Sequence, residues 1–235
     1  MTTLIPTPLL DWLDLAGVAV FALTGALAAA RARQTFVTMA FFALLTGVGG
    51  GSVRDLLIGA PVFWIHDGWV AGVCLAIAGL VWITPIRWWQ GSLLDYADAL
   101  GLTAYAVLGS AKALSYGVPP VPAFVMGVVT GCVGGIVRDV IAGKPSIIMR
   151  PELYVTAAAL SAALCVAGDA AGLPREAVWI GAAAAGFALR AAAIRWRLAL
   201  PGYRRSEGCD GTEVVSGQDS GAAGARSSPG SGPPG

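Results

Sequence analysis

The chain contains Thr46-Gly-Val-Gly-Gly-Gly-Ser-Val-Arg54-Asp55-Leu-Leu-Ile-Gly59-Ala-Pro61 and later Thr130-Gly-Cys-Val-Gly-Gly-Ile-Val-Arg138-Asp139-Val-Ile-Ala-Gly143-Lys-Pro145. One offset, 138 − 54 = 84, superposes the marked positions of these two copies, the doubled motif, without a gap. Both copies lie inside long apolar segments. There a glycine weakens a helix by about 1 kcal/mol relative to alanine, and a charge near the bilayer centre costs about 2.5–3.5 kcal/mol. Because the chain carries these costs twice and in register, we infer that the doubled motif has a function.

Composition is typical of a membrane protein and argues against several other classes. Of the 235 residues, 56% are apolar and 12% are charged, and the mean hydropathy is +0.72, far from the composition of soluble domains. The net charge of +1, without a basic patch that contains aromatic residues, gives no reason to expect a nucleic-acid partner. The four cysteines form neither a disulfide framework nor a metal-ligand spacing. The sequence has no nucleophile elbow and no phosphate loop followed by lysine, so we do not expect an enzyme.

Apolar segments of about 20 residues predict transmembrane helices, because such a helix crosses a hydrocarbon core of about 30 Å. Seven are predicted, over residues 11–31, 36–59, 68–85, 94–114, 121–143, 151–169 and 175–198. The expected fold is an all-α membrane protein whose transmembrane domain covers residues 1–200. Gly, Ser and Pro dominate the remainder, which predicts a disordered cytoplasmic tail over residues 201–235.

The doubled motif divides these spans into two repeats, about 11–85 and about 94–169, with the seventh span outside them. Asp95 and Asp98 in the second repeat correspond to Asp11 and Asp14 in the first. Because each repeat holds three spans, an odd number, the second repeat enters the membrane from the opposite side. The sequence therefore predicts inverted repeats related by a pseudo-two-fold axis in the membrane plane, as in many transport proteins.

Lysine and arginine near the span ends predict the orientation, because these residues concentrate on the cytoplasmic side. With the N-terminus outside, the inner side collects Arg31, Arg33, Arg87, Lys144, Arg150, Arg195, Arg197, Arg204 and Arg205. The outer side collects little beyond Lys112 and Arg175. We therefore expect an external N-terminus and a cytoplasmic C-terminus. The alanine-rich sequence without an organellar signal indicates a bacterial inner membrane.

The glycines of the doubled motif can let a helix bend or unwind in mid-membrane. Unwound backbone at that depth must be buried in protein or line a wet cavity, and the carbonyl end of the preceding half-helix can then coordinate a cation. The alternative is close helix packing, which glycines at four-residue spacing, such as Gly47 and Gly51, also favour. The residues expected to form an ion path are Gly49, Gly50, Gly51, Ser52, Arg54, Asp55, Thr130, Gly134, Gly135, Arg138 and Asp139.

The Arg-Asp pair follows each glycine cluster by about one helical turn, roughly 5 Å. If the two bends meet near the midplane, Arg54 can pair with Asp139, and Arg138 with Asp55; since adjacent residues on one helix point in different directions, other partners are the alternative. Ionisable residues inside a membrane are functional by default, so we expect these pairs to act in permeation. The alternative is a structural role in which the arginines only hold the two bends together.

Three further residues are weaker candidates for a vestibule or a gate. Asp14 and Asp98 lie near the starts of their spans, where acids commonly cap helices, but their symmetric placement also fits vestibules that concentrate cations. Lys112, near the outer end of the fourth span, either extends its ammonium to the interface or acts as a gating charge. His66, the only histidine, is expected to be an interfacial loop residue.

The two GxxGGxxRDxxxGxP elements, GVGGGSVRDLLIGAP and GCVGGIVRDVIAGKP, resemble the trimeric intracellular cation channel family, whose bacterial members are also grouped as glycine transporters. The resemblance covers about residues 11–198. It implies a homotrimer with one ion path per protomer, lined by the second and fifth spans and conducting potassium and, less selectively, sodium, with no cofactor beyond the permeating ions. Val133 replaces Gly49 in the second copy, so the two bends need not be equal. The regulatory lysine-containing motif of eukaryotic members is not evident.

Two functions remain in competition at the level of the sequence. A passive cation channel needs carbonyls and carboxylates around a wet constriction. A carrier of a small zwitterion such as glycine uses an arginine for the substrate carboxylate and an aspartate for its ammonium group. Ions need no dedicated anion site, and the carbonyl ends of both bent helices converge on the midplane. We therefore expect a channel, with the carrier as the alternative.

Overall fold

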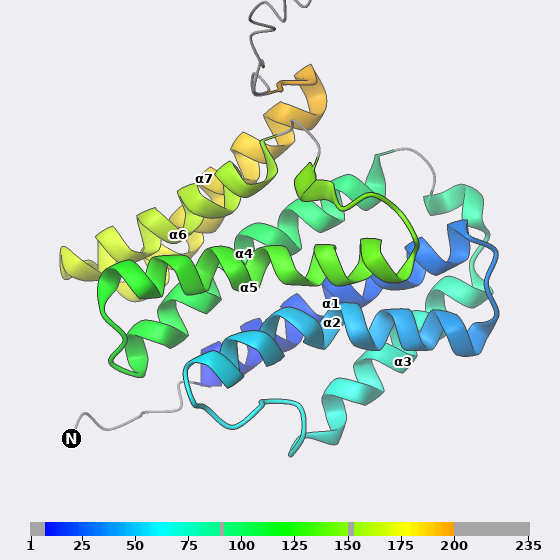
Figure 1. Cartoon of the computed structure of the whole chain (residues 1–235), viewed down its shortest axis with the longest axis horizontal. Coiled ribbons are helices and arrows are strands. Elements are labelled where there is room, and N and C mark those ends of the chain that lie inside the picture. Colours follow the sequence, from blue (N-terminus) through cyan, green and yellow to red (C-terminus); the bar gives the residue numbers. More distant parts are fainter. Residues whose placement is uncertain (1–7, 90–91, 150–152, 200–235) are drawn as a thin grey trace, which may run out of the picture. The chain divides into compact units, whose positions relative to one another are not determined.

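The structure is a computed structural model that describes residues 8–89, 92–149 and 153–199 (Figure 1). These residues form seven α-helices: α1 (Pro8–Arg31), α2 (Phe36–Leu57), α3 (Gly68–Ile83), α4 (Leu93–Ser115), α5 (Pro120–Ile141), α6 (Tyr154–Ala170) and α7 (Arg175–Trp196). The 3-10 helices η1 (Ile86–Trp89) and η2 (Ile147–Met149) follow α3 and α5. The prediction of an all-α protein with seven helices is confirmed, whereas the predicted tail over 201–235 lies outside the described residues.

Residues at the turns explain where the helices begin and end. α2 begins after Thr35, whose side-chain oxygen accepts a hydrogen bond from Thr38 N, and α3 begins after Asp67, which accepts one from Trp69 N. The predicted end of the second span at residue 59 is too late, because Gly59 has a φ of 69° and leaves the helix. The described helix ends therefore differ from the predicted ones by only a few residues.

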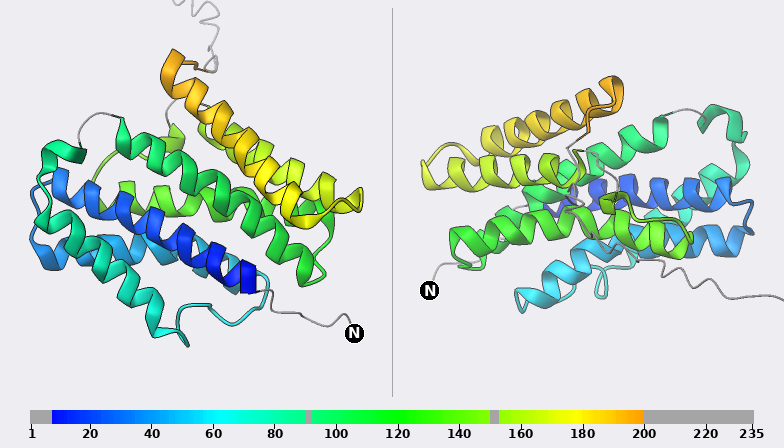
Figure 2. Two further views of the ribbon diagram at one scale, coloured as in Figure 1. Left: turned by 180° about the vertical axis from the view of Figure 1, so that it is seen from behind. Right: turned by 45° about the horizontal axis from the view of Figure 1, so that its top comes forward.

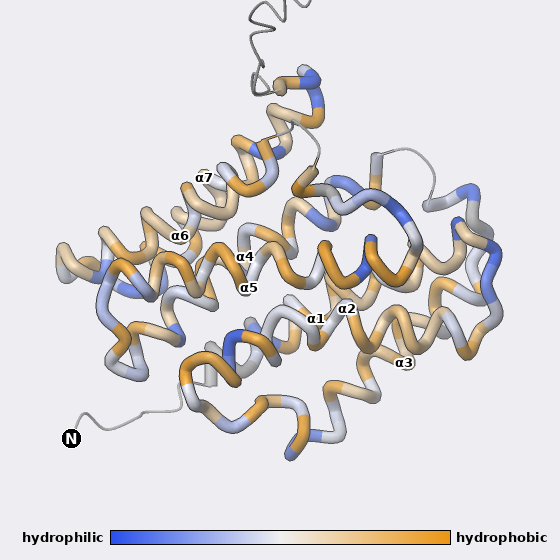
Figure 3. The backbone as a smooth tube through the Cα atoms, viewed as in Figure 1, coloured by the Kyte–Doolittle hydropathy of each residue, from blue (hydrophilic) through white to orange (hydrophobic). Residues whose placement is uncertain are grey.

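Length and composition make four segments suitable for crossing a membrane: Asp14–Arg31 of α1, and all of α2, α5 and α7. α3 and α6 are shorter apolar helices. α4 carries Asp95, Asp98 and Lys112 and is mostly buried. Figure 3 shows hydrophobic residues along most of the helices and hydrophilic residues gathered at their ends.

The helices pack as two three-helix groups. α1, α2 and α3 contact one another, and so do α4, α5 and α6. The groups meet through contacts of α1 with α4 and of α2 with α5, while α7 packs on α4 and α6 (Figures 1 and 2). In the first group the buried core includes Val18, Phe42 and Cys74. This arrangement places the two copies of the doubled motif, on α2 and α5, against each other.

The contact between α1 and α4 repeats itself about the pseudo-symmetry. A Cβ on Gly17 would collide with the ring of Tyr105, and a Cβ on Gly101, 84 residues later, would lie 3.2 Å from the ring of Phe21. The rings of Phe21 and Tyr105, which also correspond, meet edge to face with centroids 5.3 Å apart. Each glycine thus makes room for an aromatic ring of the other repeat.

The glycines of the doubled motif do not unwind their helices. Both α2 and α5 run through them as continuous α-helix, so the expectation of exposed carbonyls at an unwound segment is wrong. A Cβ on Gly50 would collide with the carbonyl oxygen of Thr130, and one on Gly49 would lie 3.6 Å from Val137 Cγ2. The absence of side chains lets the two backbones approach closely. The packing alternative therefore accounts for these glycines.

Candidate functional site

The guanidinium of Arg54 is held entirely within the first repeat. Arg54 Nη1 and Nη2 donate to the two carboxylate oxygens of Asp14 on α1, at 3.0 and 3.3 Å, and Nε donates to Asp55 Oδ1 at 2.8 Å. Arg54 and Asp55 are fully buried, and Asp14 is nearly so. Such a forked pairing has the geometry that makes arginine–carboxylate bonds strong and specific.

Asp55 connects this arginine to α4. Its Oδ1 lies 2.9 Å from Lys112 Nζ, and its Oδ2 accepts a hydrogen bond from Phe63 N at 3.1 Å. The ring of Phe63 lies beside both cations, 5.8 Å from Arg54 Cζ and 5.9 Å from Lys112 Nζ, within cation–π range. Lys112 therefore points inward to Asp55, and its side chain is only 18% exposed. We call Asp14, Arg54, Asp55 and Lys112 the outer network, since the predicted orientation places it near the outer surface.

An equivalent arrangement occurs in the second repeat. Arg138 Nη1 lies 2.5 Å from Asp98 Oδ1 on α4, Nη2 lies 2.9 Å from Asp139 Oδ1, and Nε donates to the same Asp139 oxygen at 3.0 Å. The Arg138–Asp98 and Arg54–Asp14 bonds both join residues 40 positions apart. Asp98, Arg138 and Asp139 are buried. These three residues form the inner network, on α4 and α5; α4 carries Asp98 near its start and Lys112 of the outer network near its end.

The predicted pairing of Arg54 with Asp139 and of Arg138 with Asp55 is wrong. Each arginine instead binds its own neighbouring aspartate and the aspartate on the first helix of its own repeat. The reason is their position, because Arg54 lies in the last turn of α2 and Arg138 in the last turn of α5, and these turns are at opposite ends of the antiparallel pair. The helices meet instead at their glycines, between the two networks.

The two networks differ in their additional partners. Lys112 has Ala28 at the corresponding position of the first repeat, so the inner network has no equivalent of this lysine. Beside the inner network, the hydroxyl of Tyr154 lies 2.5 Å from the position of a Cβ on Gly135, and the Tyr154 ring lies 5.3 Å from the guanidinium of Arg190 on α7. The seventh helix, outside the repeat, therefore adds a positive charge near the inner network.

Charge balance explains how the outer network is tolerated inside the protein. Its two cations, Arg54 and Lys112, face two carboxylates, Asp14 and Asp55. A buried charge is acceptable only when paired and hydrogen-bonded, and removing one member of such a set costs about 3–5 kcal/mol. The network is therefore a neutral unit whose members depend on one another.

A cavity of about 650 Å³ opens beside the outer network, and its lining comprises Trp12, Asp14, Leu15, Phe63, Asp67, Trp69, Val70, Val73 and Lys112. Asp14 and Lys112 are the network members that reach it. The charged residues of the lining are Asp14, Asp67 and Lys112, whereas Asp55, 2.9 Å from Lys112 Nζ, does not line the cavity. Among the described residues, no three His, Cys, Asp or Glu side chains are close enough together to hold a metal ion.

The remaining predicted residues lie in the helix interface or beside it. A Cβ added to Gly51 would lie 2.5 Å from the ring of Phe63, so the glycine makes room for this ring. Gly134 packs in the same way against the ring of Phe21. Ser52 Oγ donates to Val48 O and accepts from Trp64 Nε1, both at 2.8 Å. Thr130 Oγ1 donates to Met126 O at 2.6 Å. These hydroxyls are therefore bonded to their surroundings, and the structure does not aim them into the outer cavity.

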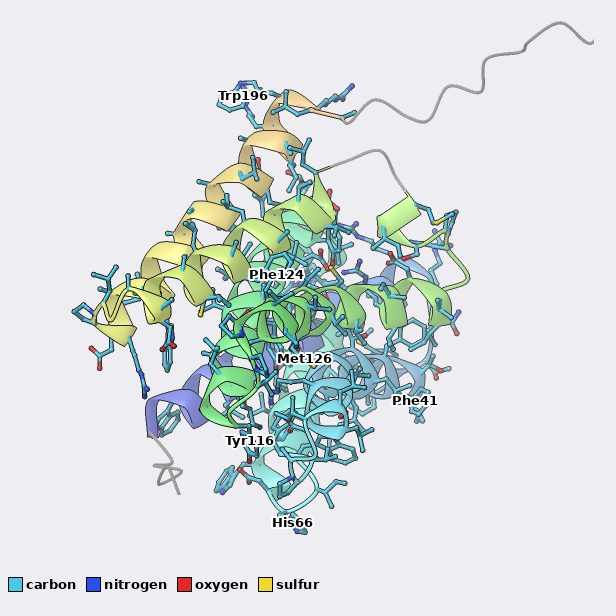
Figure 4. The ribbon with its side chains drawn as sticks, turned by 60° about the vertical axis from the view of Figure 1, so that its left-hand side comes forward. Phe41, His66, Tyr116, Phe124, Met126 and Trp196 are labelled. Carbon is cyan, nitrogen blue, oxygen red and sulfur yellow. The ribbon has the colours of Figure 1, made fainter. Side chains whose placement is uncertain are left out.

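Several residues that lie beside the networks are absent from the predicted set. Tyr154, Phe63 and Tyr105, whose hydroxyl donates to Asp14 O at 3.2 Å, carry no sequence signal that separates them from ordinary apolar positions. Arg190 does carry one, because an arginine inside an apolar helix is expensive. His66, by contrast, lies in the exposed loop between α2 and α3, as expected (Figure 4).

Comparisons with known proteins agree with this architecture. The family model described as glycine transporter matches residues 11–85 and 95–170. A UPF0126 membrane protein of Vibrio cholerae is 37% identical over 207 residues, which cover 86% of this chain and 85% of the relative. The UPF0126 inner membrane protein YadS of Escherichia coli is 34% identical over 203 residues, which cover 85% of this chain and 98% of the relative.

Solved structures of membrane channels also resemble this chain. The trimeric intracellular cation (TRIC) channel orthologue from Rhodobacter sphaeroides is 40% identical, with a TM-score of 0.76, over 82% of this chain and 100% of that one. A prokaryotic TRIC channel at 24% identity has a TM-score of 0.74, which shows the shared fold. Both repeats and both networks lie within the residues that the family model matches. The chain therefore belongs to the trimeric intracellular cation channel family, whose sequence model is described as glycine transporter.

Proposed function

We propose that this chain is a passive channel for monovalent cations, chiefly potassium and less selectively sodium, with a pore in each protomer along α2 and α5. The observation that carries the proposal is the pair of charged networks. Each one neutralises an arginine with two aspartates of its own repeat. The two networks lie at opposite ends of the α2–α5 interface, where carboxylates attract cations from either side of a membrane.

The interface between the networks is closed in this structure. α2 and α5 touch at Gly50 and the Thr130 carbonyl, where an added Cβ would collide. Permeation therefore requires these helices to separate at the glycines of the doubled motif. Gly49, Gly50, Gly51, Gly134 and Gly135 would then border the path, because small residues leave the helix surfaces free to move past each other.

Lys112 is the proposed gate of the outer entrance. Its ammonium lies 2.9 Å from Asp55 and also lines the outer cavity. A cation cannot reach the Asp55 carboxylate while Lys112 occupies it. A charge that moves in the membrane field responds to voltage, by about 2.3 kcal/mol per elementary charge for 100 mV across the whole membrane. Displacement of Lys112 away from Asp55 would therefore open this entrance in a voltage-dependent way.

A carrier of a small zwitterion such as glycine is the second candidate. The outer cavity favours it, since its lining includes a carboxylate, Asp14, and an ammonium group, Lys112. Against it stands the state of Arg54, which both Asp14 and Asp55 already bind. A substrate carboxylate would have to displace one of these aspartates. A permeating cation needs no such exchange, so the geometry supports the channel better.

The proposal includes the assembly and the placement of the chain. The solved relatives are named trimeric channels, which supports a homotrimer, and a relative is named an inner membrane protein, which supports a bacterial inner membrane. The excess of arginine and lysine at one side supports an external N-terminus and a cytoplasmic tail over 201–235. The channel needs no cofactor and no nucleic acid, and it is not an enzyme.

Reconstitution separates the two functions. Purified protein in planar bilayers is expected to give unitary potassium currents, with smaller sodium currents under the same gradient. In vesicles, the same preparation is expected to show no saturable glycine uptake. Silent bilayers together with saturable, competable glycine uptake would replace the channel by the carrier.

A further inference from the structure

The turn that follows α1 contains a residue with an unusual backbone conformation. Arg33 has a φ of 53°, in the left-handed region, whereas the corresponding residue of the second repeat is Gly117, with a φ of 77°. The two turns share their hydrogen bonds, because Arg33 N donates to Ala30 O at 3.0 Å and Gly117 N to Leu114 O at 2.9 Å. Glycine adopts this conformation readily, while other residues do so rarely. An arginine thus occupies a position that the same fold fills with glycine in its second copy.

A cavity of about 500 Å³, the turn cavity, lies beside this turn, and its lining comprises Ala30, Arg31, Arg33, Gln34, Met39, Val81, Trp82 and Thr84. Its polar lining residues are Arg31, Arg33 and Gln34, all exposed, and the half-buried Thr84. Its apolar part comes from α2 and α3, where Met39 and Val81 are buried. The cavity therefore joins a positively charged mouth to an apolar wall.

The neighbouring contacts hold this arrangement in place. Arg31 Nη2 donates to Trp89 O of η1 at 3.2 Å, which connects the end of α1 to η1. Trp82 is 53% exposed, and its ring meets that of Phe36 edge to face with centroids 5.7 Å apart. Half-exposed tryptophan at a helix end is typical of the boundary between hydrocarbon and headgroups. Trp82 therefore gives the mouth of the cavity a side chain of the kind that membrane proteins place at headgroup depth.

We propose that the turn cavity binds an anionic phospholipid, with the phosphate on Arg31 and Arg33 and an acyl chain along Met39, Val81 and Trp82. Guanidinium groups bind phosphate through paired hydrogen bonds, and basic pockets between membrane helices hold anionic headgroups. The positive-inside preference explains why arginines gather on this side. It does not explain why one of them occupies a left-handed position at the mouth of an apolar cavity. This inference concerns lipid binding and does not depend on cation conduction.

Arg33→Gly is the principal test, because it copies Gly117 and removes the backbone strain together with the charge. Full-length protein in detergent is titrated with dioleoylphosphatidylglycerol or with dioleoylphosphatidylcholine, and lipid retention is measured by native mass spectrometry. An arginine near an anionic headgroup contributes about 1 kcal/mol, so we expect about fivefold weaker phosphatidylglycerol binding. The melting temperature without lipid is expected to be unchanged or raised. Arg33→Lys is expected to bind with intermediate strength, because lysine keeps the charge without the fork.

Arg197→Gly is the matched control. Arg197 also has a left-handed φ, 51°, at the end of a helix, α7, and it does not line the turn cavity. This variant is expected to retain phosphatidylglycerol as the unmodified protein does. Equal weakening by Arg197→Gly and Arg33→Gly would show general charge attraction and overturn the site, as would unchanged binding by Arg33→Gly. Displacement of the lipid by millimolar inorganic phosphate would show a free-anion site and overturn the lipid assignment.

Discussion

Replacement of Asp55 by asparagine tests the outer network most directly. Asparagine has the shape of aspartate but keeps one acceptor oxygen, so it can accept the hydrogen bond from Arg54 Nε or from Phe63 N but not both, and it removes the charge that compensates Lys112. The network then carries one uncompensated positive charge beside the outer cavity. We expect potassium to be repelled from that cavity, while the Arg54–Asp14 pair remains.

The magnitude follows from Coulomb's law. A unit charge about 5 Å from a permeating ion acts with about 3 kcal/mol at an effective dielectric constant near 20. At 1.4 kcal/mol per factor of ten, potassium occupancy of the outer cavity falls roughly a hundredfold. Loss of a partner from a buried set of charges also costs about 3–5 kcal/mol of stability. Assembly must therefore be measured together with conductance.

The double variant Asp55→Asn with Lys112→Met separates the two effects. It removes one charge of each sign, so the net charge of the network returns to zero, and we expect much of the conductance to return. Asp139→Asn in the inner network is the matched control, because the position equivalent to Lys112 is Ala28. Asp139→Asn is expected to lower the potassium conductance less than Asp55→Asn does, because it leaves the charge of the outer network unchanged.

The assay combines unitary potassium currents in planar bilayers with size-exclusion chromatography in detergent. Asp55→Asn that elutes as the unmodified protein does, with unchanged conductance, would refute a role of this carboxylate in permeation. Misfolding of Asp55→Asn, corrected by Lys112→Met without any change in unitary conductance, would show that the network is only structural.

Three further predictions follow from the helix contacts and from the orientation. Gly50→Ala places a methyl group against the Thr130 carbonyl and is expected to lower the melting temperature, at a cost of about 1–3 kcal/mol, whereas Gly49→Ala, with Val137 Cγ2 at 3.6 Å, is expected to be tolerated. In the double variant Gly49→Cys with Val137→Cys, the two Cβ atoms lie about 3.9 Å apart, a distance suitable for a disulfide. Oxidation is expected to abolish the potassium current and reduction to restore it. A cross-linked protein that conducts normally contradicts the separation of α2 and α5. Reporter fusions after residues 33 and 205 are both expected to be cytoplasmic, and an external signal at either site contradicts the proposed orientation.

The sequence by itself determined the helical architecture. Long apolar segments can satisfy their backbone groups in a membrane only as helices or closed barrels, and prolines and glycines mark where each helix stops, so seven helices and their approximate ends were predictable. The doubled motif also predicted the repeat, and it identified four charged candidates that the structure buries: Arg54, Asp55, Arg138 and Asp139. The candidates Asp14, Asp98 and Lys112 were identified only weakly, because an acid in a first turn and a lysine in a last turn have common local explanations.

Only the tertiary structure decided the partners. Pairing of Arg54 with Asp14 instead of Asp139 depends on which ends of α2 and α5 lie together, and no local spacing contains that information. Glycines have the same sequence signature whether they unwind a helix or let two helices touch, and the distance from Gly50 to the Thr130 carbonyl distinguishes the two cases. The turn cavity likewise depends on α3 lying beside the α1–α2 turn. Local propensity determines helices, whereas the pairing of charges and cavities arises from contacts between residues distant in the chain.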